Sequence, residues 1–393
     1  MSPPARPRLR RDRTRPRVAV RLDLASAYGR SEAIGLARYV ANGQPWRVEL
    51  SVADENPQSI RHIDADGLIM PVTTQAMRDE VMRLGIPVVS IAGNLEGPGL
   101  PVVTVDHHAV GRMAAEFFMD RGFEHFAYAG LDGRYYVSRR FGGYAERLRE
   151  AGATCVQHIT GISGSTGRPS ATARRRLRQW LQARITPTAL FVCDDLHAVM
   201  VLEEARSIGL RIPEELAVLA VDNDELTCNL SDPPLSSIDH GSQQIGYQAG
   251  RLLDSLLRGE AAPEAPVVVP PQDLIARRST DTYPRTHPDI SRAIAFMHAH
   301  LQQPVSVDEI AEAASVSRRS LEKLFREVLH RSVLEEYHRL RIEAIKLSLT
   351  QGDHPLKRIA EEMGFSTVHY FSSFFSRRVG MAPAAWRKMA NGR

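Results

Sequence analysis

The sequence predicts an α/β domain of two lobes followed by an all-α domain with two helix-turn-helix motifs. Three observations lead to this fold class. At 393 residues the chain is too long for one ordinary core. Short β-branched runs alternate with amphipathic helices between residues 17 and 280. A pattern of two short helices joined by a turn then occurs twice after residue 288.

Composition restricts the class of protein further. With 43% hydrophobic and 24% charged residues the chain is typical of a soluble globular protein. It has no run of eighteen apolar residues and no apolar core of a signal peptide at its N-terminus, so we expect a cytoplasmic protein with no membrane partner. Cys155, Cys193 and Cys228 are isolated and lack metal-ligand spacing, which favours buried small hydrophobic residues and no metal or cofactor.

Charge is distributed unevenly along the chain. Residues 1–17 hold seven Arg and one Asp, residues 18–287 hold 27 basic and 33 acidic residues, and residues 288–393 hold 16 basic and 12 acidic residues. Basic ends favour nucleic acid as a partner, and an acidic middle favours a small or uncharged ligand. Residues 1–16 lack periodicity and indicate a disordered basic tail, with a DNA-contacting arm as the alternative.

The region 17–280 contains two series of βαβ units. Such units are right-handed and build parallel sheets, and this much α/β sequence favours two lobes with a ligand cleft between them. The predicted strands are 17–20, 67–70, 87–90 and 102–105 in the first series and 125–129, 189–192 and 216–221 in the second, and the predicted helices include 31–40, 75–84 and 110–121.

Polar residues follow several of these strands and are candidates for ligand binding. Ligands of open α/β sheets lie at the carboxyl ends of the strands. Carboxylates, an amide, a guanidinium and an aromatic face together suit a sugar. The alternative is that each Asp or Asn caps the helix that follows its strand. The candidates at strand ends are Asp23, Tyr28, Arg30, Asp194, Asp222 and Asn223.

Residues Pro187 to Asp224 resemble the effector domain of the LacI/GalR regulators, which is similar to periplasmic sugar-binding proteins. Further matching segments are Val105-Asp106, Arg140-x-x-Gly143-Tyr144, 234–238 and 277–280. The resemblance implies that Arg140, Asp194 and Asp222 contact the effector, with Asn223 as a companion. For Arg140 the alternative is an ion pair on a helix surface. Residues 281–288 contain two prolines and indicate a linker.

The first helix-turn-helix pattern lies at 305–325. Val307, Ile310 and Ala311 recur at helical spacing, and after a break at 314–316 the residues Leu321, Leu324 and Phe325 do so again. Ser317 is placed to cap the second helix. The predicted outward face carries Arg318, Arg319, Glu322 and Lys323, and a short helix with such a cationic face suits the DNA major groove.

The second pattern lies at 356–375. It places Ile359-Ala360 on a supporting helix, Gly364 at the turn, and Tyr370, Phe371 and Phe375 inward. A helix at 332–349 separates the two motifs and spans about 27 Å at 1.5 Å per residue, which suits two reading heads about one DNA turn apart. The predicted outward residues of the second motif are Val368, His369, Ser372 and Ser373.

Residues 289–393 resemble the DNA-binding domain of AraC/XylS regulators. The resemblance rests on Gly364-Phe365, Tyr370-Phe371, Phe375-x-Arg377, Gly380, Pro383 and Trp386-Arg387. It implies that both recognition helices enter adjacent segments of the major groove, so the outward residues of the two motifs are expected to contact DNA.

LacI/GalR regulators carry their helix-turn-helix at the N-terminus, whereas here only sixteen residues precede the first strand. A LacI-like sensor joined to an AraC-like reader resembles the xylose operon regulators. That resemblance implies D-xylose as effector, transcription activation, a homodimer and RNA polymerase as a further partner; the residues alone indicate a small neutral polyol. Another sugar or metabolite, and a sugar-binding protein that does not bind DNA, stay open. No constellation of residues supports an enzyme.

Overall fold

The computed structural model describes residues 15–54, 56–93, 100–163, 168–282, 288–329, 331–350 and 354–390. The predictions for residues 1–14 of the basic tail and 283–287 of the linker lie outside these residues. The chain divides into two compact units, each described by itself. The first contains residues 1–110 and 239–272, and the second contains 111–238 and 273–393.

The first unit is built on a parallel sheet of strand order β2-β1-β3-β4. β5 pairs in parallel with β13 beside it. The strands are β1 (Arg17–Leu22), β2 (Arg47–Val52), β3 (Gly67–Met70), β4 (Val88–Ser90), β5 (Val103–Val105) and β13 (Val267–Val269), and the helices are α1 (Ala27–Ala41), the 3-10 helix η1 (Pro57–His62), α2 (Gln75–Arg83) and α8 (Ser242–Leu257).

Helices α1 and α8 pack with their backbones close together, and glycines permit this. A Cβ added to Gly35 would lie 1.8 Å from the carbonyl oxygen of Gln243, and one added to Gly246 would lie 1.9 Å from that of Glu32. Both distances are impossible for real atoms, so neither position accepts a side chain. Tyr39 of α1 donates to Asp254 of α8 at 2.9 Å, which adds a buried hydrogen bond between the two helices.

The second unit begins with a six-stranded sheet of order β14-β12-β11-β10-β6-β7. Its strands are β6 (His125–Leu131), β7 (Cys155–Thr160), β10 (Thr188–Val192), β11 (Leu216–Val221), β12 (Ser236–Asp239) and β14 (Asp273–Ile275), with a small hairpin of β8 (Ile162–Ser163) and β9 (Arg168–Pro169). The helices are α3 (His107–Met119), α4 (Tyr135–Glu150), α5 (Ala171–Gln182), α6 (Asp195–Ser207) and α7 (Glu225–Leu230), followed by the 3-10 helix η3 (Arg278–Thr280).

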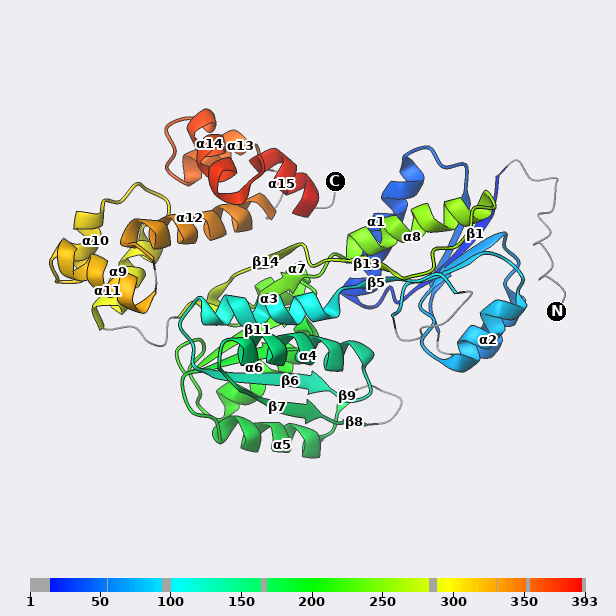
Figure 1. Ribbon diagram of the computed structural model, residues 1–393, viewed down its shortest axis with the longest axis horizontal. Helices are drawn as coiled ribbons and strands as arrows, with labels where there is room; N and C mark the ends of the chain where they lie inside the picture. The colour runs from blue at the N-terminus through cyan, green and yellow to red at the C-terminus, as the bar shows by residue number, and fades with distance from the viewer. Residues whose placement is uncertain are drawn as a thin grey trace. The chain divides into compact units, whose positions relative to one another are not determined.

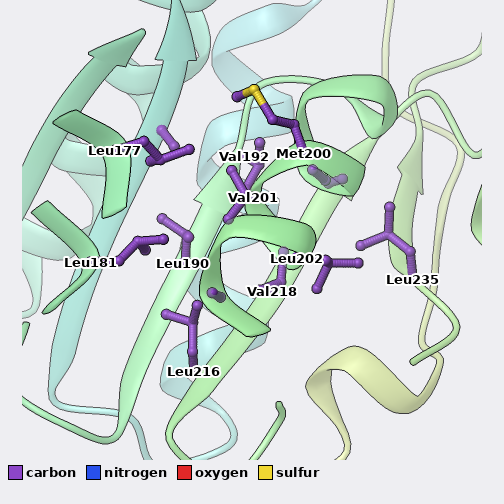
Figure 2. Packing of buried hydrophobic residues seen from close by; sticks show 14 of the residues in the cluster. Leu177, Leu181, Leu190, Val192, Met200, Val201, Leu202, Leu216, Val218 and Leu235 are labelled. Atoms are coloured by element: carbon purple, nitrogen blue, oxygen red, sulfur yellow. The ribbon is translucent and has the colours of Figure 1, made fainter. Parts of the chain in front are cut away.

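Strands β10 and β11 lie at the centre of this sheet and every residue in them is buried. One face packs on α5 and α6, where Leu177, Leu190, Val201 and Val218 meet in an apolar core (Figure 2). Continuous apolar strands of this kind are typical of parallel sheets covered on both faces. Because β6, β10, β11 and β12 are parallel, their carboxyl ends meet at one edge.

The rest of the second unit is helical: α9 (Pro288–Ala299), α10 (Val307–Ala313), α11 (Arg318–Val328), α12 (Val333–Thr350), α13 (Leu356–Glu362), α14 (Val368–Val379) and α15 (Pro383–Ala390). Helices α9–α11 lie at one end of α12 and α13–α15 at the other (Figure 1). Each group has its own apolar core with one half of α12. Tyr337 and Leu340 belong to the core of α9–α11, whereas Ile345 and Leu349 belong to the core of α13–α15. The predicted fold class, with two helix-turn-helix motifs on either side of a long helix, is confirmed.

Candidate functional site

Arg140 lies on α4 and is only 3% exposed. One of its guanidinium nitrogens donates to the carbonyl of Cys193, which follows β10, and another lies 3.8 Å from the carboxylate of Asp222, which follows β11. Its Nε has no hydrogen-bond partner among the described residues. The predicted alternative of a surface ion pair is therefore wrong. A buried guanidinium with an unsatisfied N–H is costly unless a further acceptor completes it.

Asp222 and Asn223 form a sharp turn at the end of β11. Their φ angles are 115° and 50°, in the left-handed region that residues other than glycine rarely adopt. Such conformations persist where surrounding structure holds them, and they concentrate at functional sites. The Asp222 amide donates to Ile238 O at 3.0 Å, and the Asn223 amide donates to Ser237 Oγ at 2.9 Å.

The electrostatic environment of Asp222 is unusual for a carboxylate. Burial raises its pKa well above the ordinary value, Arg140 opposes this, and Asp195 and Asp194 add to the increase. Its side chain nevertheless keeps 22% of its surface exposed. A carboxyl group that lies near a cation and is partly exposed to solvent can form a hydrogen bond with a polyol hydroxyl, as donor when it is protonated and as acceptor when it is ionised.

Asp194 caps a helix and also contacts Tyr136. One carboxylate oxygen accepts from the backbone of His197 at 2.8 Å and caps α6, which confirms the capping alternative for this residue. The other oxygen accepts from Tyr136 Oη at 3.0 Å. The Tyr136 ring lies 4.7 Å below the Arg140 guanidinium. Tyr136, Arg140, Asp194 and Asp222 therefore gather at one edge of the sheet.

Asn223 and Asp195 stabilise this edge. The side-chain oxygen of Asn223 accepts from Arg277 at 3.0 Å. Asp195, 1% exposed, accepts from Ser237 Oγ at 2.6 Å and from the Asp224 amide at 2.8 Å. Burial raises the pKa of Asp195 to about 7. Together these bonds hold the segments after β10 and β11 to strand β12 and to the segment after β14.

The three candidates of the first unit lie around the start of α1. Asp23 is exposed and its side chain accepts from the Ala25 amide at 3.2 Å. Tyr28 stacks on His240 with ring centroids 5.3 Å apart. Arg30 is exposed and donates to the carbonyls of Leu24 and Ala25 at 3.2 and 2.6 Å. Asp23 and Arg30 thus close the β1–α1 turn, and Tyr28 presents an aromatic surface.

The first helix-turn-helix motif consists of α10 and α11. Ser317 caps α11 by accepting from the Ser320 amide at 3.1 Å, as predicted. Arg318 and Arg319 are exposed in its first turn, and Arg318 pairs with Asp308 at 3.0 Å. Lys323 is exposed as well and lies 3.7 Å from Glu327, whereas Glu322 is half-buried. The outward face is therefore cationic.

The second motif consists of α13 and α14, and it corrects two predictions. Tyr370, predicted to point inward, is 59% exposed, and Phe374 is buried in its place. Val368, predicted to point outward, packs partly against the core of α13–α15. A helix that buries Phe371, Phe374 and Phe375 turns its apolar stripe away from position 370.

The remaining residues of the second motif agree with the predicted face only in part. His369 is exposed, and Ser372 and Ser373 are half-buried. The outward surface of α14 therefore consists of His369 and Tyr370 in the first turn and of Arg377 and Arg378 at the end of the helix.

Sequence reasoning missed Tyr136 and Arg277 as parts of the effector-domain site. Tyr136 precedes Arg140 by one helical turn, so helical spacing places the two side chains on one face. Arg277 lies far from Asn223 in the sequence and only the sheet brings them together. No group of His, Cys, Asp and Glu suited to a metal ion occurs in the described part of the chain. None of its helices is long and apolar enough to cross a membrane.

Two family models match the chain. A periplasmic binding protein-like domain matches residues 115–280, and a helix-turn-helix domain matches residues 310–389. A solved structure described as xylose-binding transcription activator xylR has a TM-score of 0.63 and 26% sequence identity, and the likeness covers 95% of this chain and 98% of that one.

Curated relatives agree with the structural match. The xylose operon regulatory protein of Haemophilus influenzae is 26% identical over 382 residues, which cover 94% of this chain and 98% of the relative. That of Escherichia coli K12 is 26% identical over 386 residues, which cover 95% of this chain and 97% of the relative.

The fold, the two motifs and the two family matches define a transcription regulator in which a periplasmic binding protein-like effector domain is joined to an AraC-type DNA-binding domain. Along nearly its whole length the chain is a homologue of the xylose operon regulatory proteins.

Proposed function

We propose that this protein activates transcription of a D-xylose utilisation operon when D-xylose binds its effector domain. The observation that carries the proposal is the buried Arg140 guanidinium beside Asp222, in a chain that also contains two helix-turn-helix motifs. The names of its homologues give the sugar and the sign of regulation.

A neutral sugar suits the chemistry of Arg140 and Asp222. The Nε of Arg140 has no partner among the described residues and needs an acceptor, and the Asp222 carboxyl group lies 3.8 Å from the guanidinium. A hydroxyl group suits both groups, because it donates one hydrogen bond and accepts two. Tyr136 adds an aromatic ring beside the guanidinium, against which the apolar face of a sugar can pack.

The other candidate residues complete the proposal. Asp23, Tyr28, Arg30 and Asn223 are proposed effector contacts on the same chemistry. For DNA, we propose contacts by Arg318, Arg319, Glu322 and Lys323 of α11 and by His369, Ser372 and Ser373 of α14.

We also propose a homodimer that works with RNA polymerase on cytoplasmic DNA. The edge strand β2 supports a second copy as partner: Val48, Leu50 and Val52 alternate along one face and are 38%, 51% and 63% exposed. Alternating apolar residues on an edge strand are usually covered by a partner. Sedimentation of the full chain at micromolar concentration tests this, and a monomer at all concentrations would contradict it.

The proposal that the protein is not an enzyme has its own test. All of its named homologues act as regulators. Incubation with D-xylose should return the sugar unchanged by NMR over hours, and any stoichiometric product would contradict the proposal.

The central test is the variant Asp222→Ala. It should abolish detectable D-xylose binding by calorimetry and leave DNA affinity in the absence of sugar unchanged, because α11 and α14 are untouched. Asp79→Ala, at an exposed position of α2, is the matched control and should bind sugar like the wild type. Undiminished D-xylose affinity of Asp222→Ala would refute the proposed site. Screening pentoses and hexoses by thermal shift separates D-xylose from another sugar.

A further inference from the structure

Helix α12 carries a stripe of charged residues that lies apart from the apolar residues with which the helix packs into the two cores. Glu336, Arg339, Glu343 and Lys346 recur at i, i+3, i+7 and i+10, which places them along one side of the helix. The opposite side packs into the cores of the two reading motifs. Despite their charge, Glu336 is fully buried and Arg339 and Glu343 are 22% and 26% exposed at their side chains.

The first half of this stripe meets the end of α3. Arg121, 6% exposed, lies 3.1 Å from the carboxylate of Glu343 and 3.5 Å above the ring of Phe117. Arg331, just before α12, donates to the carbonyl of Asp120 at 2.8 Å and pairs with Glu336 at 3.1 Å. Burial raises the pKa of Glu343, but Arg339 and Arg121 outweigh it and lower that pKa overall. The contact is therefore a network of charged side chains with little access to water, in which burial raises the pKa of Glu336 to about 7.

Helix α3 is in turn fixed to the helix that carries Arg140. A Cβ on Gly111 of α3 would lie 2.0 Å from the carbonyl oxygen of Arg140, so the two backbones touch at the proposed effector residue. Arg112 pairs with Glu150 at 2.7 Å, and Arg147 pairs with Glu116 at 3.1 Å. Two helices held this closely have little room to move independently, so Arg140 and Arg121 lie on one tightly packed pair of helices.

The second half of the stripe meets β14. Both carboxylate oxygens of Asp273 accept from Lys346, at 2.9 and 2.8 Å, and one accepts from Trp386 Nε1 at 3.1 Å. Lys346 also lies 5.6 Å from the Trp386 ring, which is buried in the core of α13–α15. Asp273 thus contacts α12 and α15, the two helices that pack against the second reading motif.

Strand β14 leads back to the proposed effector residues. Arg277, two residues after its end, donates to Asn223 at 3.0 Å and to the carbonyl of Leu235 at 2.9 Å. Its backbone amide donates to Ser236 Oγ at 2.7 Å, which ties it to β12. The turn that presents Asp222 is therefore connected to Asp273 by four residues of extended backbone.

We propose that the charged stripe of α12 is the docking surface through which sugar binding is coupled to DNA binding. This inference rests on the proposed function. Two contiguous routes inside the second unit, from Arg140 through α3 to Glu343 and from Asp222-Asn223 through β14 to Lys346, end on the same helix. That helix carries a reading motif on each half, so a shift of either contact changes how the two recognition helices are presented.

The alternative is that these ion pairs only stabilise the fold. Spatial continuity alone does not distinguish the two roles, since coupling must be measured as a free energy that links two sites. The discriminating quantity is the ratio of DNA affinities with and without saturating D-xylose. A merely structural contact changes stability and leaves that ratio intact.

The test uses the full chain, a fluorescent DNA fragment that the wild type binds, and D-xylose. The double variant Glu343→Gln with Lys346→Met should bring the ratio of DNA affinities to within about twofold of one, from a wild-type value typical of allosteric proteins, about 5 to 150. D-xylose affinity by calorimetry should stay within about threefold of the wild type, because the changed residues lie outside the proposed sugar site. Lys346→Arg, which can keep both bonds to Asp273, should retain the wild-type ratio.

Controls make each outcome decisive. Arg211→Met removes an exposed ion pair with Glu215 of similar length and should leave the ratio unchanged. If the double variant does not fold, Lys346→Met alone carries the test, since Trp386 still donates to Asp273. A double variant with the full wild-type ratio overturns the inference. A wild type that binds neither D-xylose nor DNA instead refutes the proposed function, and the inference falls with it.

Discussion

The two helix-turn-helix motifs share an architecture and differ in how they close their turns. In the first, Ser315 takes a φ of 60°, and in the second, Gly364 takes a φ of 70°. The backbone of Gln302 explains the difference, because a Cβ on Gly364 would lie 2.1 Å from its carbonyl oxygen. A left-handed residue can be a serine where there is room, and it must be glycine where another backbone approaches.

The motifs also differ in the chemistry of their recognition helices. The first turn of α11 presents Arg318 and Arg319, whereas that of α14 presents His369 and Tyr370. Cationic side chains neutralise phosphates or bind guanine edges, and neutral ones read by hydrogen bonds and apolar contact. The comparison teaches that a repeated fold does not imply a repeated mode of reading, and we expect α11 to supply most of the salt-dependent affinity.

The largest expected effect tests the turns. Gly364→Ala should destabilise the second motif by about 2–4 kcal/mol, because alanine pays for the left-handed conformation and its Cβ collides with Gln302. Hydrogen exchange of the α13–α14 amides measures the loss. Gly380→Ala is the matched control: its φ is 82° but nothing lies within 4 Å of the added Cβ, so only about 1 kcal/mol should be lost. Equal losses for both variants would remove the role assigned to Gln302.

The next effect tests the reading chemistry. Arg319→Ala should weaken DNA binding by about 1–3 kcal/mol and, if the contact is to phosphate, lower the salt slope by about 1. His369→Ala should cost less and change the salt slope less than Arg319→Ala does, because it removes no guanidinium group. Fluorescence anisotropy across a salt series measures both. A larger change in salt slope for His369→Ala than for Arg319→Ala would reverse the assignment.

A third test uses pH to separate the motifs. Burial, with Arg378 and Arg341, lowers the pKa of His338 to about 4. Its Nδ1 lies 2.8 Å from an Arg378 nitrogen of α14, a contact that requires the neutral ring. Since the unfolded chain binds the proton more readily, stability is full above pH 6.5 and falls as the pH drops toward 4.

His338 is half-buried, so its effect is discounted for solvent screening. We expect the free energy of opening that protects the α14 amides to fall by about 1 kcal/mol between pH 7 and pH 5. The loss should appear in the α14 amides and not in those of α11, by hydrogen exchange corrected for intrinsic rates. In His338→Gln the difference between the two helices should disappear. Uniform acid sensitivity of both motifs would contradict this account.

The smallest expected effect returns to the first turn. Ser315→Gly should stabilise the first motif by about 0.5 kcal/mol, because the relief of left-handed strain, about 1–2 kcal/mol, exceeds the cost of the greater chain entropy that glycine loses on folding, about 0.5–1 kcal/mol. Ser320→Gly, inside α11, should instead destabilise it by about 0.5–1 kcal/mol. Thermal unfolding of the full chain, together with hydrogen exchange of the α10 and α11 amides, distinguishes the two variants. A destabilised Ser315→Gly would show that the serine side chain has a role beyond the turn.

Periodicity along the sequence predicted the parts of this protein that depend on neighbours in the chain. The strands at 67–70 and 216–221, the Ser317 cap and the turn at Gly364 all follow from spacing within a few residues. Strand β2 was not predicted, although Val48, Leu50 and Val52 alternate with polar residues in its sequence, and all six of its residues are exposed.

The amino-acid sequence by itself determined the element types, the two motifs and the polar residues at strand ends, because each depends on local hydrogen bonding and on one buried face. Only the tertiary structure decided that Arg140 is buried against Cys193, that Arg277 reaches Asn223, and that Asp273 holds Lys346. Those pairs lie tens of residues apart, and sheet order and helix packing set their distances. Tyr370 belongs with them, because three other aromatic residues compete for the same core and their packing decides which ring stays outside.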